Sequence, residues 1–280
     1  MPAPQLNLMP ENLEPTRATL HQYAHAIGVV PRVHAEPHEK WWHVSLNITE
    51  RGLETDSMPL PDGSALNLRL DLQSHSVVVE ANGEIQERIP FGDGLTGTQM
   101  GEAVLAAVAE HGLSGDYPRE KFESDEARRY DPAAAEAFFE NLTAIHEVLE
   151  THRARLGESV GPLQLWPHGF DLAFEWFGTR VEEYEEHGGL QRLPAQCNFG
   201  FYPGGRPYFY ANPWPFESDT LLAVELPAGA EWHTEGWEGS MLNYDKVAGD
   251  ESAAERILDY LGAVYEAAAP TLNVGGPSDD

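Results

Sequence analysis

One segment limits the folds open to this chain more than any other. From Leu66 to Leu72 leucines alternate with polar residues, and a valine-rich run, the dipeptide Asn82-Gly83 and a second extended run follow. Side chains of a β-strand point alternately to opposite faces, so this alternation predicts a strand with one buried face. Asn-Gly between two extended runs is typical of a tight hairpin. The segment therefore predicts an antiparallel meander.

The rest of the chain adds helices and further strands. Apolar residues at helical spacing predict helices over Pro15–Ile27, which Gly28 would end, over Gly97–His111, from Asp131-Pro132 to Gly157, and over Ser252–Ala268. Further strands are expected at Trp41–Thr49, Gly161–Arg180, Ala195–Pro203, Arg206–Pro215, Leu221–Leu226 and Glu231–Tyr244. We expect an α+β protein: an antiparallel sheet with helices packed on one side, in two related lobes.

These elements suggest one compact domain between two tails. The expected boundaries are an N-terminal tail at 1–12, a single α+β domain at 13–270 with lobes at about 13–113 and 131–270 joined by 114–130, and a C-terminal tail at 271–280.

Charge and cysteine content limit the classes of function. The formal net charge is −29, which argues against nucleic-acid binding through a basic surface. An acidic, lysine-poor surface suits a salt-rich cytoplasm, which suggests a halophilic host. The single cysteine, Cys197, cannot form an intramolecular disulfide and reads as a buried strand residue. No apolar run approaches the roughly 20 residues of a membrane span. We expect a cytoplasmic protein without a membrane partner.

The segment Gly161–Arg180 carries the first candidate chemistry. A regular strand would put His168 and Asp171 on opposite faces, but Pro167 and Gly169 mark a bulge or an edge. One extra residue at Gly169 would bring the two side chains to the same face. A carboxylate beside an imidazole is typical of general bases and of metal ligands. The same pair can also be a structural hydrogen bond that closes a buried bulge.

A second pair extends this candidate site. His233 and Glu235 would share one strand face, and with His168 and Asp171 they would supply two imidazoles and two carboxylates, a suitable set for zinc, iron or manganese. His43, on the polar face of its expected strand, is a third candidate catalytic residue beside His168 and Asp171.

A pair of helical histidines allows a further metal reading. His21 and His25 stand at helical i, i+4 spacing, which can hold a metal but is more typical of a helix flank.

Aromatic residues concentrate in the second half of the chain, which predicts either a thick core or an aromatic-walled pocket. Five of them are candidates to stack on an organic ligand such as a sugar: Trp166, Tyr208, Tyr210, Trp232 and Trp237.

Three segments resemble the marker segments of a bacterial family of unknown function: Trp41-Trp42-His43-Val44 with Arg51-Gly52-Leu53, then Leu165–Ala173, then Trp232–Trp237. The resemblance extends from about Leu13 to Ala268. Because that family has no established activity, the resemblance implies no catalytic roles. It favours the following residues for testing: His43, His168, Asp171, His233 and Glu235.

Three functions remain open at this point. The first is a metal-dependent enzyme acting on a small molecule, in which His168 and His233 with Asp171 or Glu235 hold a divalent metal that activates water. The second is a non-enzymatic protein that binds a sugar-like molecule. The third is an interaction protein that pairs through the edge of its sheet. Neither the substrate nor the oligomeric state can be predicted.

Overall fold

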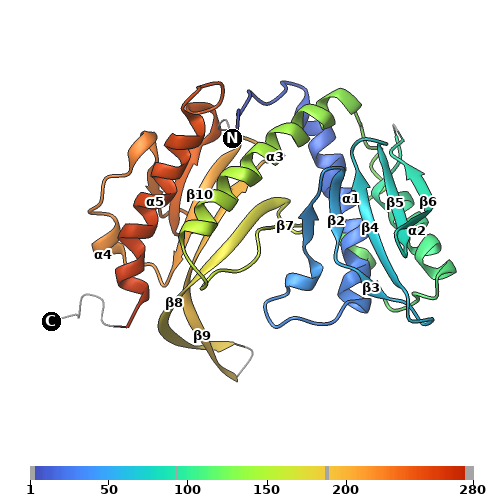
Figure 1. Ribbon diagram of the computed structural model, residues 1–280, viewed down its shortest axis with the longest axis horizontal. Coiled ribbons are helices and arrows are strands. Elements are labelled where there is room, and N and C mark those ends of the chain that lie inside the picture. Colours follow the sequence, from blue (N-terminus) through green and yellow to red (C-terminus); the bar gives the residue numbers. More distant parts are fainter. Residues whose placement is uncertain (1–3, 93, 187–188, 275–280) are drawn as a thin grey trace. The chain divides into compact units, whose positions relative to one another are not determined.

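The computed structural model of the chain describes residues 4–92, 94–186 and 189–274. Within these ranges it contains five α-helices and twelve β-strands, which belong to two compact units (Figure 1). Unit 1 comprises the described parts of Met1–Leu8, Ala144–Leu163 and Leu172–Asp280, and unit 2 those of Met9–Thr143 and Gln164–Asp171. Every strand pairing within a unit is antiparallel. The predicted α+β class is therefore confirmed.

Unit 2 contains seven strands in the order β7-β1-β2-β4-β5-β6, with β3 paired to β4. Their bounds are β1 Leu46–Ile48, β2 Gly52–Thr55, β3 Met58–Pro59, β4 Ala65–Asp71, β5 Ser76–Ala81, β6 Glu84–Pro90 and β7 Gln164–Trp166. The hairpin of β5 and β6 turns at Asn82 and Gly83, which both have positive φ as this turn requires. The predicted meander is confirmed.

Two helices cover one face of this sheet. Helix α1 (Leu13–His34) contacts β2, β3 and β4, and helix α2 (Gly97–Glu110) contacts β5 and β6. The expected end of α1 at Gly28 is wrong, because the helix continues for six more residues. Gly28 is buried where an added Cβ would lie 3.2 Å from Pro167 Cγ, so the glycine permits close packing instead of ending the helix.

The other face of the unit 2 sheet carries a buried ion-pair network. Arg69 on β4 bonds the carboxylates of Glu54 and Glu80, and its Nε lies 3.3 Å from Asp71. Asp71 is fully buried and also accepts a hydrogen bond from Arg51 at 2.7 Å. Charges this deep persist only when paired, so the network holds three strands in register.

The expected strand Trp41–Thr49 is only partly formed. Trp41 has a left-handed φ of 62°, Trp42–Val44 form one 3-10 turn called η1, and β1 begins at Leu46. The Ser45 hydroxyl and amide both donate to the Trp42 carbonyl, at 2.6 and 3.2 Å, and keep the turn closed. His43 therefore lies in a turn and is buried, whereas the alternation placed it on the polar face of a strand.

Unit 1 contains five strands in the order β11-β12-β10-β9-β8. Their bounds are β8 Asp171–Glu186, β9 Gly189–Tyr202, β10 Tyr208–Trp214, β11 Glu231–His233 and β12 Gly239–Asn243. The expected strand Leu221–Leu226 is wrong. The short helix α4 (Ser218–Leu221) ends there, and the Leu222 amide donates to the Ser218 carbonyl at 3.0 Å.

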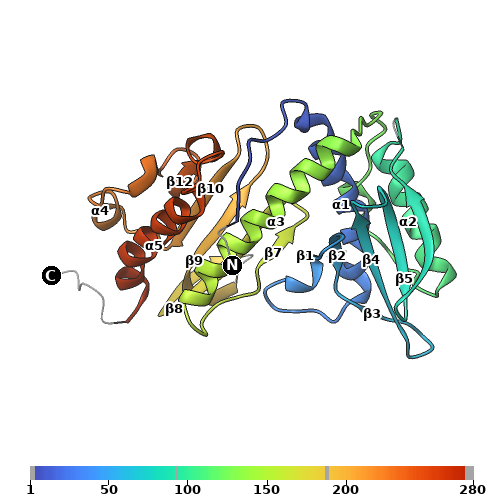
Figure 2. The ribbon, with the colours of Figure 1, turned by 45° about the horizontal axis from the view of Figure 1, so that its top comes forward.

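Helix α5 (Ala253–Leu272) covers one face of the unit 1 sheet and contacts β9, β10 and β12 (Figures 1 and 2). Three fully buried phenylalanines, Phe199, Phe201 and Phe209, lie on the sheet, and Tyr260 of α5 shares a 2.9 Å hydrogen bond with Ser240 of β12. Side chains at the alternate positions of the unit 1 strands point to the opposite face of the sheet.

Helix α3 (Pro132–Arg155) contributes its last twelve residues to unit 1. His152 of this part packs on the α5-covered side of the sheet, with its ring 4.7 Å from that of Phe199.

Part of the expected N-terminal tail is fixed to unit 1, where the Leu6 carbonyl accepts from Gly249 at 2.7 Å. No helix in the described ranges is long and apolar enough to cross a membrane.

Candidate functional site

The stretch around His168 consists of two strands joined by a tight turn. Strand β7 ends at Trp166, β8 begins at Asp171, and the Phe170 amide donates to the Trp166 carbonyl at 2.7 Å. Phe170 has a left-handed φ of 58° and a fully buried side chain. The expectation of one bulged strand is wrong, because residues 167–170 form a turn between the two strands and Pro167 has no amide hydrogen to donate to a neighbouring strand.

The turn holds His168 and Asp171 in different surroundings. His168 is exposed, and its ring meets the edge of Trp166 at 5.9 Å. The Asp171 carboxylate lies over Gly169, where an added Cβ would be 2.5 Å from Oδ1. The glycine is thus required by the position of the carboxylate.

Helix α1 brings two more histidines to this turn. His21 Nε2 forms a 2.9 Å hydrogen bond with the Pro167 carbonyl, and its ring stacks on Phe170 at 5.3 Å and on His25 at 4.8 Å. Burial and the charge of Arg17 lower the pKa of His21, while the Pro167 carbonyl opposes them. The i, i+4 pair therefore packs against the β7–β8 turn.

A small cavity of about 30 Å³ opens beside His25. We call it the cationic pocket, and its lining is His25, Gly28, Arg32, Val44, Lys121, Pro167 and His168. Four of these seven residues are basic. Burial lowers the pKa of His25 to about 4, and the positive charges of His21, Lys121, His168 and Arg32 add to the effect.

His43 is connected to this pocket through Trp41, which contacts both His43 and the pocket residue Arg32. Trp41 covers the Arg32 guanidinium at 5.1 Å and stacks on the His43 ring at 5.5 Å. His43 Nδ1 accepts a hydrogen bond from the His38 amide at 3.1 Å, which leaves Nε2 to carry the proton in the neutral ring. Burial, followed by the charges of Arg32 and His38, lowers the pKa of His43.

In unit 1, five rings adjoin on the side of the sheet opposite α5. We call them the aromatic face: Tyr202, Tyr208, Tyr210, His233 and Trp237. Each ring is partly exposed and lies within 6.4 Å of another. Trp237 stacks on Tyr208, meets Tyr210 edge-on, and holds His233 at a centroid distance of 4.6 Å.

Two glycines allow these rings to lie close to the sheet. A Cβ added to Gly200 would be 2.5 to 2.7 Å from three atoms of Tyr210, which is its cross-strand partner. One added to Gly239 would be 2.5 Å from Trp237. Because real Cβ atoms do not approach so closely, both glycines are needed for the present ring positions.

The structure brings some of the predicted ligand-binding residues together and separates others. Tyr208, Tyr210 and Trp237 share the aromatic face. Trp232 pairs with Ser240 and lies on the α5 side, where its indole donates to the Val224 carbonyl at 2.9 Å. Trp166 belongs to unit 2 and contacts His168.

The predicted metal ligands are divided between the units. His233 and exposed Glu235 belong to unit 1, whereas His168 and Asp171 belong to unit 2. Among the described residues, no group of three or more His, Cys, Asp and Glu side chains is placed to hold a metal ion.

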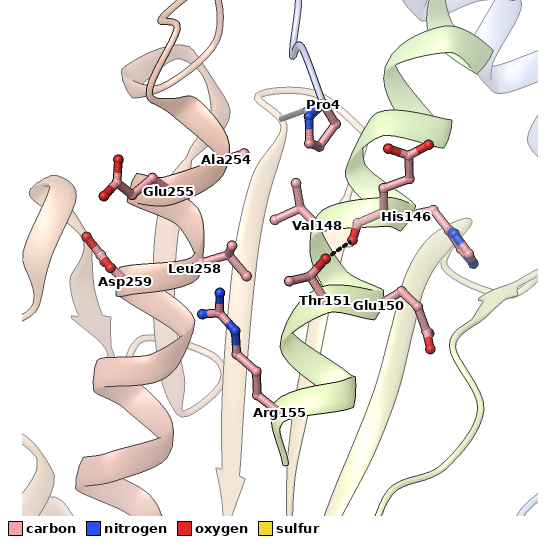
Figure 3. Close-up of a pocket in the computed structure, with 11 residues that line it drawn as sticks. Pro4, His146, Val148, Glu150, Thr151, Arg155, Ala254, Glu255, Leu258 and Asp259 are labelled. Carbon is pink, nitrogen blue, oxygen red and sulfur yellow. Dashed lines mark hydrogen bonds between the residues drawn. The ribbon is translucent and has the colours of Figure 1, made fainter. Parts of the chain in front are cut away.

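A larger groove of about 780 Å³ lies between α3 and α5 of unit 1 (Figure 3). Its lining includes apolar Val148 and Leu258, several carboxylates and the guanidinium of Arg155, which lies between the two helices (Figure 3). Glu150 is paired with Arg153 at 2.6 Å, which is outside the lining. The groove therefore carries charges of both signs beside its apolar side chains.

Comparison with protein families identifies the chain. Residues 4–275 match the model of a family of unknown function, DUF5996. The chain belongs to this family. The predicted resemblance to an uncharacterised family is thereby confirmed. Comparisons with curated proteins and with solved structures give no match.

Sequence reasoning missed part of both clusters. The spacing of His21 and His25 was visible, but Arg32 and Lys121 carry no motif, and Lys121 comes from the 3-10 turn η2 (Arg119–Lys121) far along the chain. Tyr202 could have been found, because it stands two residues after Gly200 and therefore on the same face.

Proposed function

We propose that this protein binds a small organic molecule with a flat apolar face, such as a sugar, on the aromatic face of unit 1. The supporting observation is the continuous contact of five partly exposed rings on the sheet surface that α5 leaves uncovered. Partly exposed aromatic rings offer apolar surface together with polar edges, which is what a ligand of mixed polarity needs.

The rings are held in place before any ligand binds. Tyr210 lies over Gly200 and Trp237 over Gly239, so both rings have little freedom to rotate. A binding surface that is already ordered loses less conformational entropy on binding. His233 adds ring nitrogens at the edge of Trp237, where they can exchange hydrogen bonds with a ligand hydroxyl.

The alternative function, pairing with another protein through the sheet edge, finds little support in the edge strand of unit 2. Strand β6 pairs only with β5 among the described strands, and it carries Glu84, Glu87, Arg88 and Pro90. Charges and proline are features that protect an edge from pairing with another chain. Aromatic stacking is therefore the function that we favour.

The enzymatic alternative has its own test. Protein purified in high salt without chelators would be subjected to elemental analysis. About one equivalent of zinc, iron or manganese, lost in His168→Ala or His233→Ala without loss of fold, would favour metal-dependent chemistry over simple binding.

The proposed function is tested by ligand screening and calorimetry. A panel of monosaccharides and short oligosaccharides is screened by thermal shift, because a ligand of the native state raises the melting temperature. Hits are measured by titration calorimetry with wild type, Tyr210→Ala and Trp237→Ala. Each substitution should weaken binding about tenfold or more, since stacking on one ring contributes about 1–3 kcal/mol.

A matched control is Trp232→Phe, which changes a tryptophan on the opposite side of the same sheet. It should leave the affinity of a hit unchanged. Equal loss of affinity in Trp232→Phe and Trp237→Ala would contradict the proposed location, and a panel without any hit would contradict sugar binding.

A further inference from the structure

Two basic residues of the cationic pocket differ from most arginines of the chain in their charge partners. Most arginines of this acidic chain pair with a carboxylate, including Arg17, whose Nη2 lies 2.7 Å from Glu14. In the described part of the chain, no ion pair joins Arg32 or Lys121 to a carboxylate. Both line the cationic pocket with His25 and His168. Four basic residues therefore face one cavity in a chain that has 46 acidic residues.

We propose that the cationic pocket binds an oxyanion, the phosphate group of a small ligand. Its basic groups come from three segments: His25 and Arg32 from α1, Lys121 from η2, and His168 from the β7–β8 turn. A guanidinium and an ammonium around one cavity are the usual partners of phosphate. This site is separate from the aromatic face and does not depend on the function proposed for it.

The size of the pocket determines how much of a ligand it can enclose. About 30 Å³ is close to the volume of one water molecule, so the cavity takes the tip of an oxyanion and leaves the remainder of the ligand outside. His168 and Lys121 are exposed and can close on the outer oxygens. Trp41 holds Arg32 from the other side at 5.1 Å, which fixes the guanidinium before binding.

A bound anion would reduce the repulsion between a protonated His25 and the basic groups around it. His25 faces His21, Arg32, Lys121 and His168, which all disfavour its protonated form, and the nearby charge of Arg17 is offset by Glu14. Bound phosphate would place negative charge beside His25 and make protonation easier. Because the net charge of −29 repels anions at long range, tight binding would have to come from the pocket itself.

The test uses inorganic phosphate and glycerol phosphate, added to the full chain at constant ionic strength. Binding is measured by calorimetry, and the pKa of His25 by NMR of its Cε1 proton. We expect saturable binding and a His25 pKa above about 4. Tighter binding of glycerol phosphate would indicate an organic phosphate as the ligand, and tighter binding of inorganic phosphate would indicate the free anion. Either result supports the site.

Two variants and a control locate the binding. Lys121→Gln changes an exposed residue and should weaken phosphate binding about tenfold, which is the loss of about 1.4 kcal/mol. Arg32→Gln should weaken it at least as much. Arg155→Gln in unit 1 removes an exposed arginine outside the pocket and should change nothing. Absence of saturable binding, or equal loss in Arg155→Gln and Lys121→Gln, would overturn the proposal without affecting the aromatic face.

Discussion

His152 should make the stability of this protein depend on pH. Its side chain is almost fully buried, its ring lies 4.7 Å from Phe199 and 6.2 Å from Phe174, and its Nε2 has no hydrogen-bond partner among the described residues. Burial, with the charge of Arg155 nearby, lowers the pKa of His152 to about 4. The folded protein therefore contains the neutral imidazole across the neutral and weakly acidic range.

The direction of the effect follows from the pH at which His152 binds a proton in the folded and in the unfolded state. In the unfolded chain His152 has a pKa near 6.5, so between pH 6.5 and 4 the unfolded state binds more protons than the folded state. The free energy of unfolding must then fall as the pH falls through this range. From these two pKa values the loss at pH 4.5 is roughly 2.5 kcal/mol for this one group.

The assay compares urea unfolding of wild type and His152→Phe at pH 7 and pH 4.5. Phenylalanine preserves a ring in the core and removes the unpaired nitrogen, so the variant should be close to wild type at pH 7. Between the two pH values it should lose roughly 2 kcal/mol less than wild type. His25, whose pKa is also lowered to about 4, is unchanged in both proteins and cancels from the comparison. Equal pH dependence in the two proteins would refute a buried neutral His152.

Three further outcomes are expected. Gly200→Ala should lower the free energy of unfolding by about 1–3 kcal/mol, because the added methyl would lie 2.5 Å from the Tyr210 ring. In a Tyr210→Ala background most of this cost should vanish. Equal costs in urea titrations of both backgrounds would argue against the packing. Cys197 is fully buried, which raises the pKa of its thiol, so it should react with a thiol reagent only after urea unfolding; rapid reaction of the native protein would contradict its placement. The urea midpoint should rise from low to high sodium chloride concentration, because salt screens the repulsion within a chain whose net charge is −29. A midpoint that does not change with salt would contradict charge repulsion and adaptation to a salt-rich host.

The sequence predicted best those elements in which two kinds of local pattern, such as side-chain alternation and turn residues, indicate the same structure. The hairpin at Asn82-Gly83 combines alternation with turn chemistry, and α2 has a capping box in which the Thr96 side chain accepts from the Gln99 amide at 3.1 Å. Gly28 misled the prediction of α1, because its role is close contact with Pro167, which is distant in sequence. Tertiary packing decides such positions.

The candidate sites were only partly predictable for a related reason. Tyr208 and Tyr210 stand two residues apart and must share a strand face, so their grouping follows from the sequence. Trp232 and Trp237 are separated by the turn between β11 and β12, and alternation cannot be counted across that turn. Lys121 reaches His25 only through the fold, and no spacing rule connects them.

Saturation-transfer NMR on the sugar hits tests the central claim most directly. Irradiation of the protein should saturate the carbon-bound protons on one face of the sugar, because those protons would lie against the rings of Tyr208, Tyr210 and Trp237. The effect should disappear in Tyr210→Ala and persist in Trp232→Phe, which alters the other side of the sheet. A transfer that survives in Tyr210→Ala, or that is lost in Trp232→Phe alone, would contradict ligand binding on the aromatic face.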